Sequence, residues 1–207
     1  PWQTYDVPSV AGDILALIEH FGADRAHLVG HSFSAAPAVW VAAERPECVR
    51  SLVLVGPFVR AVKVNPVMAG LFWLMMHNPW RVRTWRMYYG TMYPSRKPAD
   101  FAQYLDALAK NLAEPGRMDA AAALAASSRE PSDTRLEGVE APALVLMGSK
   151  DPDFPDPAAE AQIVAHRTGG QVRMIEGAGH YPMAEMPEET AAALIDFFNR
   201  VPRPAAG

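Results

Sequence analysis

Gly30-His31-Ser32-Phe33-Ser34 stands between a short apolar run and a helical pattern. A serine on a sharp turn from strand to helix lifts its Oγ clear of the sheet, and the residues two positions away must then be small. Gly30 meets this requirement, and Ser34 comes close to it. The backbone amide of Phe33 would lie at the N-terminus of the following helix, where its N–H can donate to an oxygen that develops negative charge. The stretch therefore predicts a nucleophilic serine at a strand–helix junction.

Four short runs rich in Val, Leu and Ile are bounded by Gly, Pro or Asp, as buried strands are. They are Ala26–Val29, Ser51–Val55, Ala143–Met147 and Gln171–Ile175. Their apolarity is continuous rather than alternating, which indicates strands covered on both faces. Helical patterns lie between them, for example from Val10 to Phe21 and from Ala191 to Phe198. The expected fold is α/β, with a mostly parallel sheet and helices on both of its faces.

Residues 61–138 interrupt this alternation of strands and helices. They contain no strand-like run, and their Met, Trp, Tyr and Ala residues recur at helical spacing. Prolines divide the stretch into short helices, because each disfavours helix in the residue before it. These prolines are at positions 66, 79, 94, 98, 115 and 131. We expect a helical cap or lid at 61–138, inserted into an α/β core formed by residues 1–60 and 139–201.

Two further polar groups follow the last two predicted strands. Asp151 ends the stretch Gly148-Ser149-Lys150-Asp151, and His180 follows Gly177-Ala178-Gly179. Ligand sites of open α/β sheets gather at the carboxyl ends of their strands. The stretch Gly30–Ser34 has the form of a nucleophile elbow, and this elbow, followed in order by an acid and a histidine, resembles the α/β-hydrolase superfamily. The resemblance covers roughly residues 5–198.

The resemblance implies a catalytic triad of Ser32, Asp151 and His180. His180 would accept the proton of Ser32 during attack, and Asp151 would fix the tautomer of the ring and stabilise its cationic form. Asp153 is the alternative acid, whereas Asp156 is expected to cap a helix that begins at Pro157.

The neighbours of the serine have expected roles as well. The backbone N–H of Phe33 is the expected oxyanion donor, and His31 and Phe58 are candidate pocket residues. We expect His31 to shape the elbow rather than to take part in the chemistry. A serine nucleophile also argues against the dehalogenases and epoxide hydrolases of the superfamily, which use aspartate at this position.

Composition limits the classes of partner. The 207 residues are 50% hydrophobic and 20% charged, with a net charge of −4 and no block of like charges. This pattern excludes the electrostatic basis for nucleic-acid binding, so a small-molecule substrate is expected. No apolar run approaches the roughly 20 residues of a membrane span. Cys48 is the only cysteine and the histidines lack ligand spacing, so neither a metal nor a cofactor is expected, and a cytoplasmic location fits.

These observations predict a serine hydrolase that cleaves a small to medium apolar ester or related acyl compound through an acyl-Ser32 intermediate. Three alternatives remain open. A ligand-binding or signalling relative would keep the pocket without turnover, a C–C bond hydrolase would use the same triad, and a haloperoxidase-like or perhydrolase activity is compatible with it.

The resemblance also implies sheet strands beyond the four predicted here. In the family, four strands and a helix precede the position of Val7, which corresponds to roughly 60 residues. They include the turn that supplies the second oxyanion donor. We therefore expect an unpaired edge on the strand before Ser32. We expect more of the same polypeptide to complete it; an oligomer or a second chain, or a truncated homologue that has lost catalysis, are the alternatives.

Overall fold

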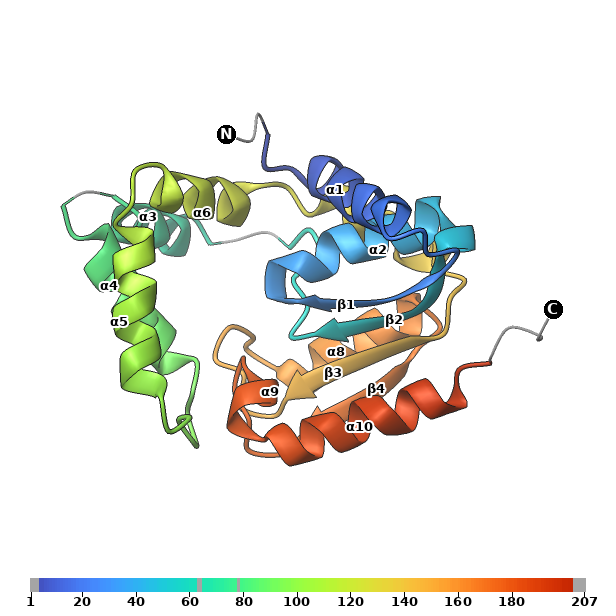
Figure 1. The fold of residues 1–207 in the computed structure, drawn as a ribbon. Coiled ribbons are helices and arrows are strands. Elements are labelled where there is room, and N and C mark those ends of the chain that lie inside the picture. Colours follow the sequence, from blue (N-terminus) through green and yellow to red (C-terminus); the bar gives the residue numbers. More distant parts are fainter. Residues whose placement is uncertain (1–3, 63–64, 78, 203–207) are drawn as a thin grey trace.

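The protein is described here by a computed structural model, which covers residues 4–62, 65–77 and 79–202. Its centre is a parallel sheet with the strand order β1-β2-β3-β4 (Figure 1). The strands are β1 (Ala26–His31), β2 (Val49–Val55), β3 (Ala143–Gly148) and β4 (Gln171–Ile175). Each includes the apolar run that predicts it, so the α/β fold class is confirmed.

Alternate residues of the central strands pack on opposite faces of the sheet. Leu52 and Leu54 belong to the core beneath α1 (Val7–His20), α2 (Ala35–Glu44) and α8 (Pro157–Arg167). Val53 and Val55 pack instead with Phe197 of α10 (Pro187–Arg200) on the other face. All four strand residues are at most 2% exposed. Because both faces need apolar cover, these runs do not alternate with polar residues.

The N-terminus of α8 confirms the sequence prediction for Asp156. Its Oδ1 accepts a hydrogen bond from the backbone N–H of Ala159 at 2.9 Å, and Pro157 is the first helical residue. The cap satisfies an amide that lacks a partner within the helix. Asp156 is thereby engaged in starting α8.

Residues 61–138, called the helical segment below, contain only helices and loops in their described part. The helices are α3 (Pro66–Met75), α4 (Arg81–Thr91), α5 (Phe101–Leu112), α6 (Arg117–Ala126) and α7 (Glu130–Asp133). The six prolines lie between these helices or in their first turns, as expected. Helices α3 to α6 lie beyond the carboxyl ends of the strands (Figure 1). Residues 1–3, 63–64 and 78 of the two predicted domains lie outside the described residues.

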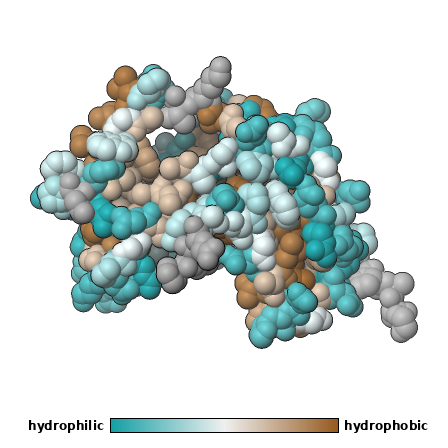
Figure 2. Space-filling view, turned by 90° about the horizontal axis from the view of Figure 1, so that it is seen from above, coloured by the Kyte–Doolittle hydropathy of each residue, from teal (hydrophilic) through white to brown (hydrophobic). Residues whose placement is uncertain are grey.

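Helix α3 carries an apolar surface that the rest of the described chain leaves uncovered. Val67, Leu71 and Trp73 are each more than half exposed. Figure 2 shows hydrophobic surface over the helical segment, at the upper left of the view. No helix of residues 4–62, 65–77 or 79–202 is long and apolar enough to span a bilayer.

Strand β1 forms one edge of the sheet. It pairs only with β2 among the described residues, and Val29 on it is 53% exposed. The predicted unpaired edge is thus present in this part of the chain. Such an edge offers free backbone N–H and C=O groups to a further strand.

Candidate functional site

Ser32 lies on a strained turn where β1 ends. Its φ is +55°, and it is the one non-glycine residue with positive φ in the described part of the chain. Conformations of this kind cost about 1–3 kcal/mol and gather at functional sites. A Cβ on Gly30 would lie 2.6 Å from Ala35 Cα, so the turn closes tightly enough to require glycine there. The predicted requirement for a small residue before the serine is confirmed.

Ser34 has a second role in the turn besides its small size. Its hydroxyl donates to the carbonyl oxygen of His31 at 2.7 Å and accepts from the backbone N–H of His31 at 2.9 Å. The two bonds tie Ser34, the last residue of the 3₁₀ turn η1 (Ser32–Ser34), back to His31 at the end of β1. Ser34 therefore holds the chain bend on which Ser32 sits.

The structure brings Asp151 and His180 together in the interior. Nδ1 of His180 is 2.8 Å from Oδ2 of Asp151, and both side chains are at most 3% exposed. The other oxygen, Oδ1, accepts from the backbone N–H of Asp153 at 3.0 Å. Both carboxylate oxygens are therefore engaged, and one of them fixes the imidazole ring.

Asp153, the alternative acid, lies near the same histidine but is directed elsewhere. Its Oδ2 is 3.7 Å from Nδ1 of His180, beyond hydrogen-bond distance. Its Oδ1 accepts from the hydroxyl of Tyr88, on α4, at 2.5 Å. Burial raises the pKa of the Asp153 carboxyl, and burial together with the charge of Asp153 raises the pKa of Tyr88 above its ordinary value. The hydroxyl of Tyr88 thus stays protonated and donates to Asp153, which links the helical segment to the turn that carries Asp151 and Asp153.

His31 connects the turn of Ser32 to the loop that carries His180, residues 176–181, called the histidine loop below. Nε2 of His31 is 2.8 Å from the carbonyl oxygen of His180, and the two ring centroids are 4.8 Å apart. Burial, followed by the charge of His180, lowers the pKa of His31 to about 4. The neutral ring, with its proton on Nε2, donates to that carbonyl. In the described structure Ser32 Oγ itself has no hydrogen-bond partner, and catalytic contacts often shorten only when substrate binds.

The lowered pKa of His31 predicts a loss of stability in acid. The unfolded chain binds a proton at His31 below about pH 6.5, whereas the folded chain resists it down to about 4. The stability contributed by neutral His31 is thus complete above pH 6.5 and is lost as the pH falls towards 4, by up to about 3 kcal/mol. Urea unfolding between pH 7 and pH 4 should show this loss in the wild type and a smaller one in His31→Gln. An equal pH dependence in both proteins would contradict the assignment.

Gly56, which follows β2, is a site residue that sequence reasoning missed. Its φ is +49°, and a Cβ there would lie 3.1 Å from Nδ1 and Cε1 of His180 and 3.2 Å from Oδ2 of Asp151. The absence of a side chain lets the His180–Asp151 pair pack directly against the backbone. The glycine after the strand was visible in the sequence, but its distant neighbours were not.

Gly56→Ala is expected to lower the free energy of unfolding by about 1–3 kcal/mol, because alanine is strained at this φ and its methyl group crowds the pair. Gly12→Ala is the matched control, since Gly12 lies in α1 with no atom within 4 Å of the added Cβ. That change should stabilise the protein by up to about 1 kcal/mol. Urea denaturation of both variants at pH 7 measures the difference. Equal effects of one sign would overturn this account of Gly56.

The backbones of Phe33 and Phe58 lie next to Ser32. The backbone N–H of Phe58 donates to the carbonyl oxygen of Ser32 at 3.2 Å. The ring of Phe58 stacks on Phe154 and lies 5.8 Å from the ring of His180. The guanidinium of Arg129 covers the Phe33 ring at 4.5 Å from its centroid. Phe58 is therefore adjacent to the Asp151–His180 pair.

Asp151, Asp153 and His180 also form the one group of described residues whose potential metal-ligand atoms gather, within 4.8 Å of one another. Their atoms are already engaged, Asp151 with His180 and Asp153 with Tyr88.

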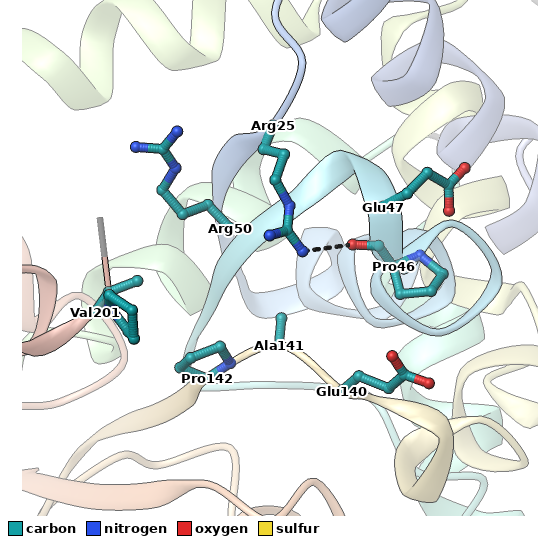
Figure 3. Close-up of a pocket in the computed structure, with 9 residues that line it drawn as sticks. Arg25, Pro46, Glu47, Arg50, Glu140, Ala141, Pro142 and Val201 are labelled. Atoms are coloured by element: carbon teal, nitrogen blue, oxygen red, sulfur yellow. Dashed lines mark hydrogen bonds between the residues drawn. The ribbon is translucent and has the colours of Figure 1, made fainter. Parts of the chain in front are cut away.

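A cavity of about 520 Å³ lies at the opposite end of the strands. Its lining includes Arg25, Arg50 and Pro142, which stand at or just before the starts of β1, β2 and β3 (Figure 3). Arg25 donates to the carbonyl oxygen of Pro46 at 3.3 Å across this cavity. Because the turn of Ser32 and the Asp151–His180 pair follow the carboxyl ends of the strands, the cavity is separate from them.

The parallel sheet with helices on both of its faces is the architecture of an α/β hydrolase. The model of the alpha/beta hydrolase family matches residues 1–193, and the chain belongs to that family. Comparison with curated proteins gave no match.

Solved structures with the same fold include enzymes of different names. A bromoperoxidase from Bacillus anthracis has a TM-score of 0.79 at 18% identity, over 96% of this chain and 76% of its own. The 2-hydroxy-6-oxo-6-phenylhexa-2,4-dienoate hydrolase of Rhodococcus sp. strain RHA1 has a TM-score of 0.77 at 18% identity, over 96% and 74%. An esterase from Rhodococcus sp. ECU1013 has a TM-score of 0.76 at 22% identity, over 96% and 74%. At these identities the likeness concerns the fold alone.

Proposed function

We propose that the protein is a serine hydrolase that cleaves small to medium apolar esters or related acyl compounds through an acyl-Ser32 intermediate, without a cofactor. The observation that carries the proposal is the buried hydrogen bond between Asp151 and His180, together with the bond from His31 that joins His180 to the strained turn of Ser32. A histidine oriented by a carboxylate is the usual activator of a serine nucleophile.

In the proposed reaction, Nε2 of His180 removes the proton of Ser32 as Oγ attacks the acyl carbon. Asp151 keeps the proton of the ring on Nδ1 and stabilises the imidazolium that forms. The backbone N–H of Phe33 donates to the oxyanion. The intermediate then expels the alcohol, which takes the proton from His180 and leaves acyl-Ser32. Water, deprotonated by His180, hydrolyses this ester and returns Ser32 to its starting state.

The helical segment acts in this proposal as a lid over the α/β core. Its position beyond the strand ends and the link from Tyr88 to Asp153 support that role. The exposed apolar side chains of α3, including Leu71 and Trp73, favour an apolar substrate. Phe58 and His31 would contribute to the wall near His180.

A small molecule is the proposed partner, and a cytoplasmic location fits the single free cysteine, Cys48. We also propose that a further strand pairs with the free edge of β1. It would come from the same polypeptide or from a second chain, and either would satisfy the backbone groups beside exposed Val29.

The direct test is hydrolysis of p-nitrophenyl esters from acetate to palmitate by the wild type, with His180→Ala as the control. We expect turnover that depends on His180 and is greatest for short and medium acyl chains. Cleavage of an activated ketone without ester cleavage would favour the C–C hydrolase alternative. A folded protein that binds such ligands but turns over none would contradict the proposal and favour the ligand-binding alternative.

A further inference from the structure

The carboxylate of Glu185 is fully buried at the end of the short helix α9 (Pro182–Glu185). It accepts three backbone hydrogen bonds: from Gly179 at 2.5 Å and from Ser95 and Arg96 at 3.0 Å each. No Lys, Arg or His of the described residues forms an ion pair with it. Burying a carboxylate is unfavourable unless its oxygens are well satisfied, so these three amides account for its presence inside the protein.

The three amides belong to two segments far apart in the sequence. Gly179 immediately precedes His180, whereas Ser95 and Arg96 follow α4 in the helical segment. Further bonds join the same two segments: His180 N–H donates to Met92 O at 3.1 Å, and Ser95 Oγ donates to Gly177 O at 2.6 Å. Glu185 therefore lies at the centre of a joint between the histidine loop and the helical segment.

The joint is packed too closely to shift freely. A Cβ on Gly179 would lie 2.3 Å from Pro94 Cδ and 2.4 Å from Met92 O. On its other side the histidine loop meets the end of β3, where a Cβ on Gly148 would lie 2.1 Å from Gly179 O. The peptide before His180 is thus enclosed by two segments, and the bond from Gly179 N–H to Glu185 sets its orientation.

We infer that Glu185 is a positioning residue for His180. By fixing the peptide that precedes His180, Glu185 holds the imidazole in line with Asp151 and Ser32. The inference rests on the proposed function. Glu185 does not touch the reacting atoms and acts through the backbone of Gly179. Catalytic groups must keep their places within about 0.5 Å, and a displacement of about 1 Å can cost about a hundredfold in rate.

Glu185→Gln tests this role with almost no change in shape. One carboxylate oxygen becomes an NH₂ group, which cannot accept a bond and would face a backbone donor. We expect kcat for ester hydrolysis to fall by about 10- to 100-fold while KM changes by less than about threefold. The apparent pKa of the pH–kcat/KM profile should shift, and the downfield ¹H NMR resonance of the His180 Nδ1 proton should move or broaden.

Glu160→Gln is the matched control. Its carboxylate is also largely buried, but it pairs with Arg60 at 2.6 and 2.8 Å, away from the histidine loop. We expect this variant to lose some stability and to keep the wild-type kcat, pH profile and Nδ1 resonance. Glu185→Asp keeps the charge but shortens the reach, so it should fall between the wild type and Glu185→Gln. It also serves as the test if Glu185→Gln fails to fold.

A folded Glu185→Gln or Glu185→Asp with unchanged kcat, pH profile and resonance would overturn the inference. Equal losses in the Glu160→Gln control would do the same, because they would indicate a general effect of stability. The resonance of the His180 Nδ1 proton can be measured without turnover. It therefore tests the positioning role of Glu185 separately from the proposed function. If the wild type hydrolyses nothing but the resonance still responds to Glu185→Gln, the proposed function fails and the positioning role holds.

Discussion

Ser32→Ala is expected to lower kcat/KM for p-nitrophenyl butyrate by a factor on the order of 10⁴ or more. The reason is that no other group would form the acyl intermediate, so only binding and the oxyanion donor would remain. The fold should persist, because Ser32 Oγ makes no hydrogen bond in the described structure. Steady-state kinetics measures the loss, and circular dichroism verifies folding.

Ser128→Ala is the control for this change. Ser128 is exposed, and its hydroxyl accepts only from the N–H of Glu130, at 3.1 Å, at the start of α7. We expect its activity to stay within about twofold of the wild type. If Ser32→Ala kept more than about a tenth of wild-type turnover, Ser32 would not be the nucleophile.

Asp151→Asn is expected to reduce kcat by a factor on the order of 10³ to 10⁴, because an amide no longer stabilises the imidazolium and permits the wrong tautomer of His180. Asp153→Asn should reduce it by less than about tenfold. The difference follows from the distances to Nδ1 of His180, 2.8 Å from Asp151 and 3.7 Å from Asp153. Asp153 is also occupied by the hydroxyl of Tyr88.

Parallel kinetics of the two variants over pH 5 to 9 distinguishes the two acids. A larger loss in Asp153→Asn than in Asp151→Asn would reverse the assignment, and equal losses would mean that the pair acts as one unit. The second variant also breaks the link to α4. A change confined to KM in Asp153→Asn would therefore indicate that Asp153 helps to position the lid rather than the histidine.

The fold was predictable from the sequence because its signals are local. The apolar run at Ser51–Val55 needs cover on both faces, and the structure provides it on both. Two adjacent residues, Asp156 and Pro157, predict both the helix cap and the start of α8. The prolines of the helical segment end its helices through steric effects on the preceding residue.

The contacts that shape the site could not be predicted from the sequence in the same way. Gly56 packs against His180, about 124 positions away, and Glu185 binds Ser95, 90 positions away. Only the fold brings these residues together. The glutamate stands in a polar, proline-flanked stretch that resembles an exposed helix start. The link from Tyr88 to Asp153 likewise depends on how the helical segment docks. The catalytic roles of Ser32, Asp151 and His180, the oxyanion role of Phe33 and the lid remain predictions.

The most direct test of the account is peptide mass spectrometry after exposure of the folded chain to a fluorophosphonate probe. The account predicts a single adduct on Ser32, absent in Ser32→Ala and formed far more slowly in His180→Ala, because the probe reacts with an activated serine. A folded wild type that forms no adduct would contradict it. So would an adduct on another serine, or one on Ser32 that forms equally fast without His180.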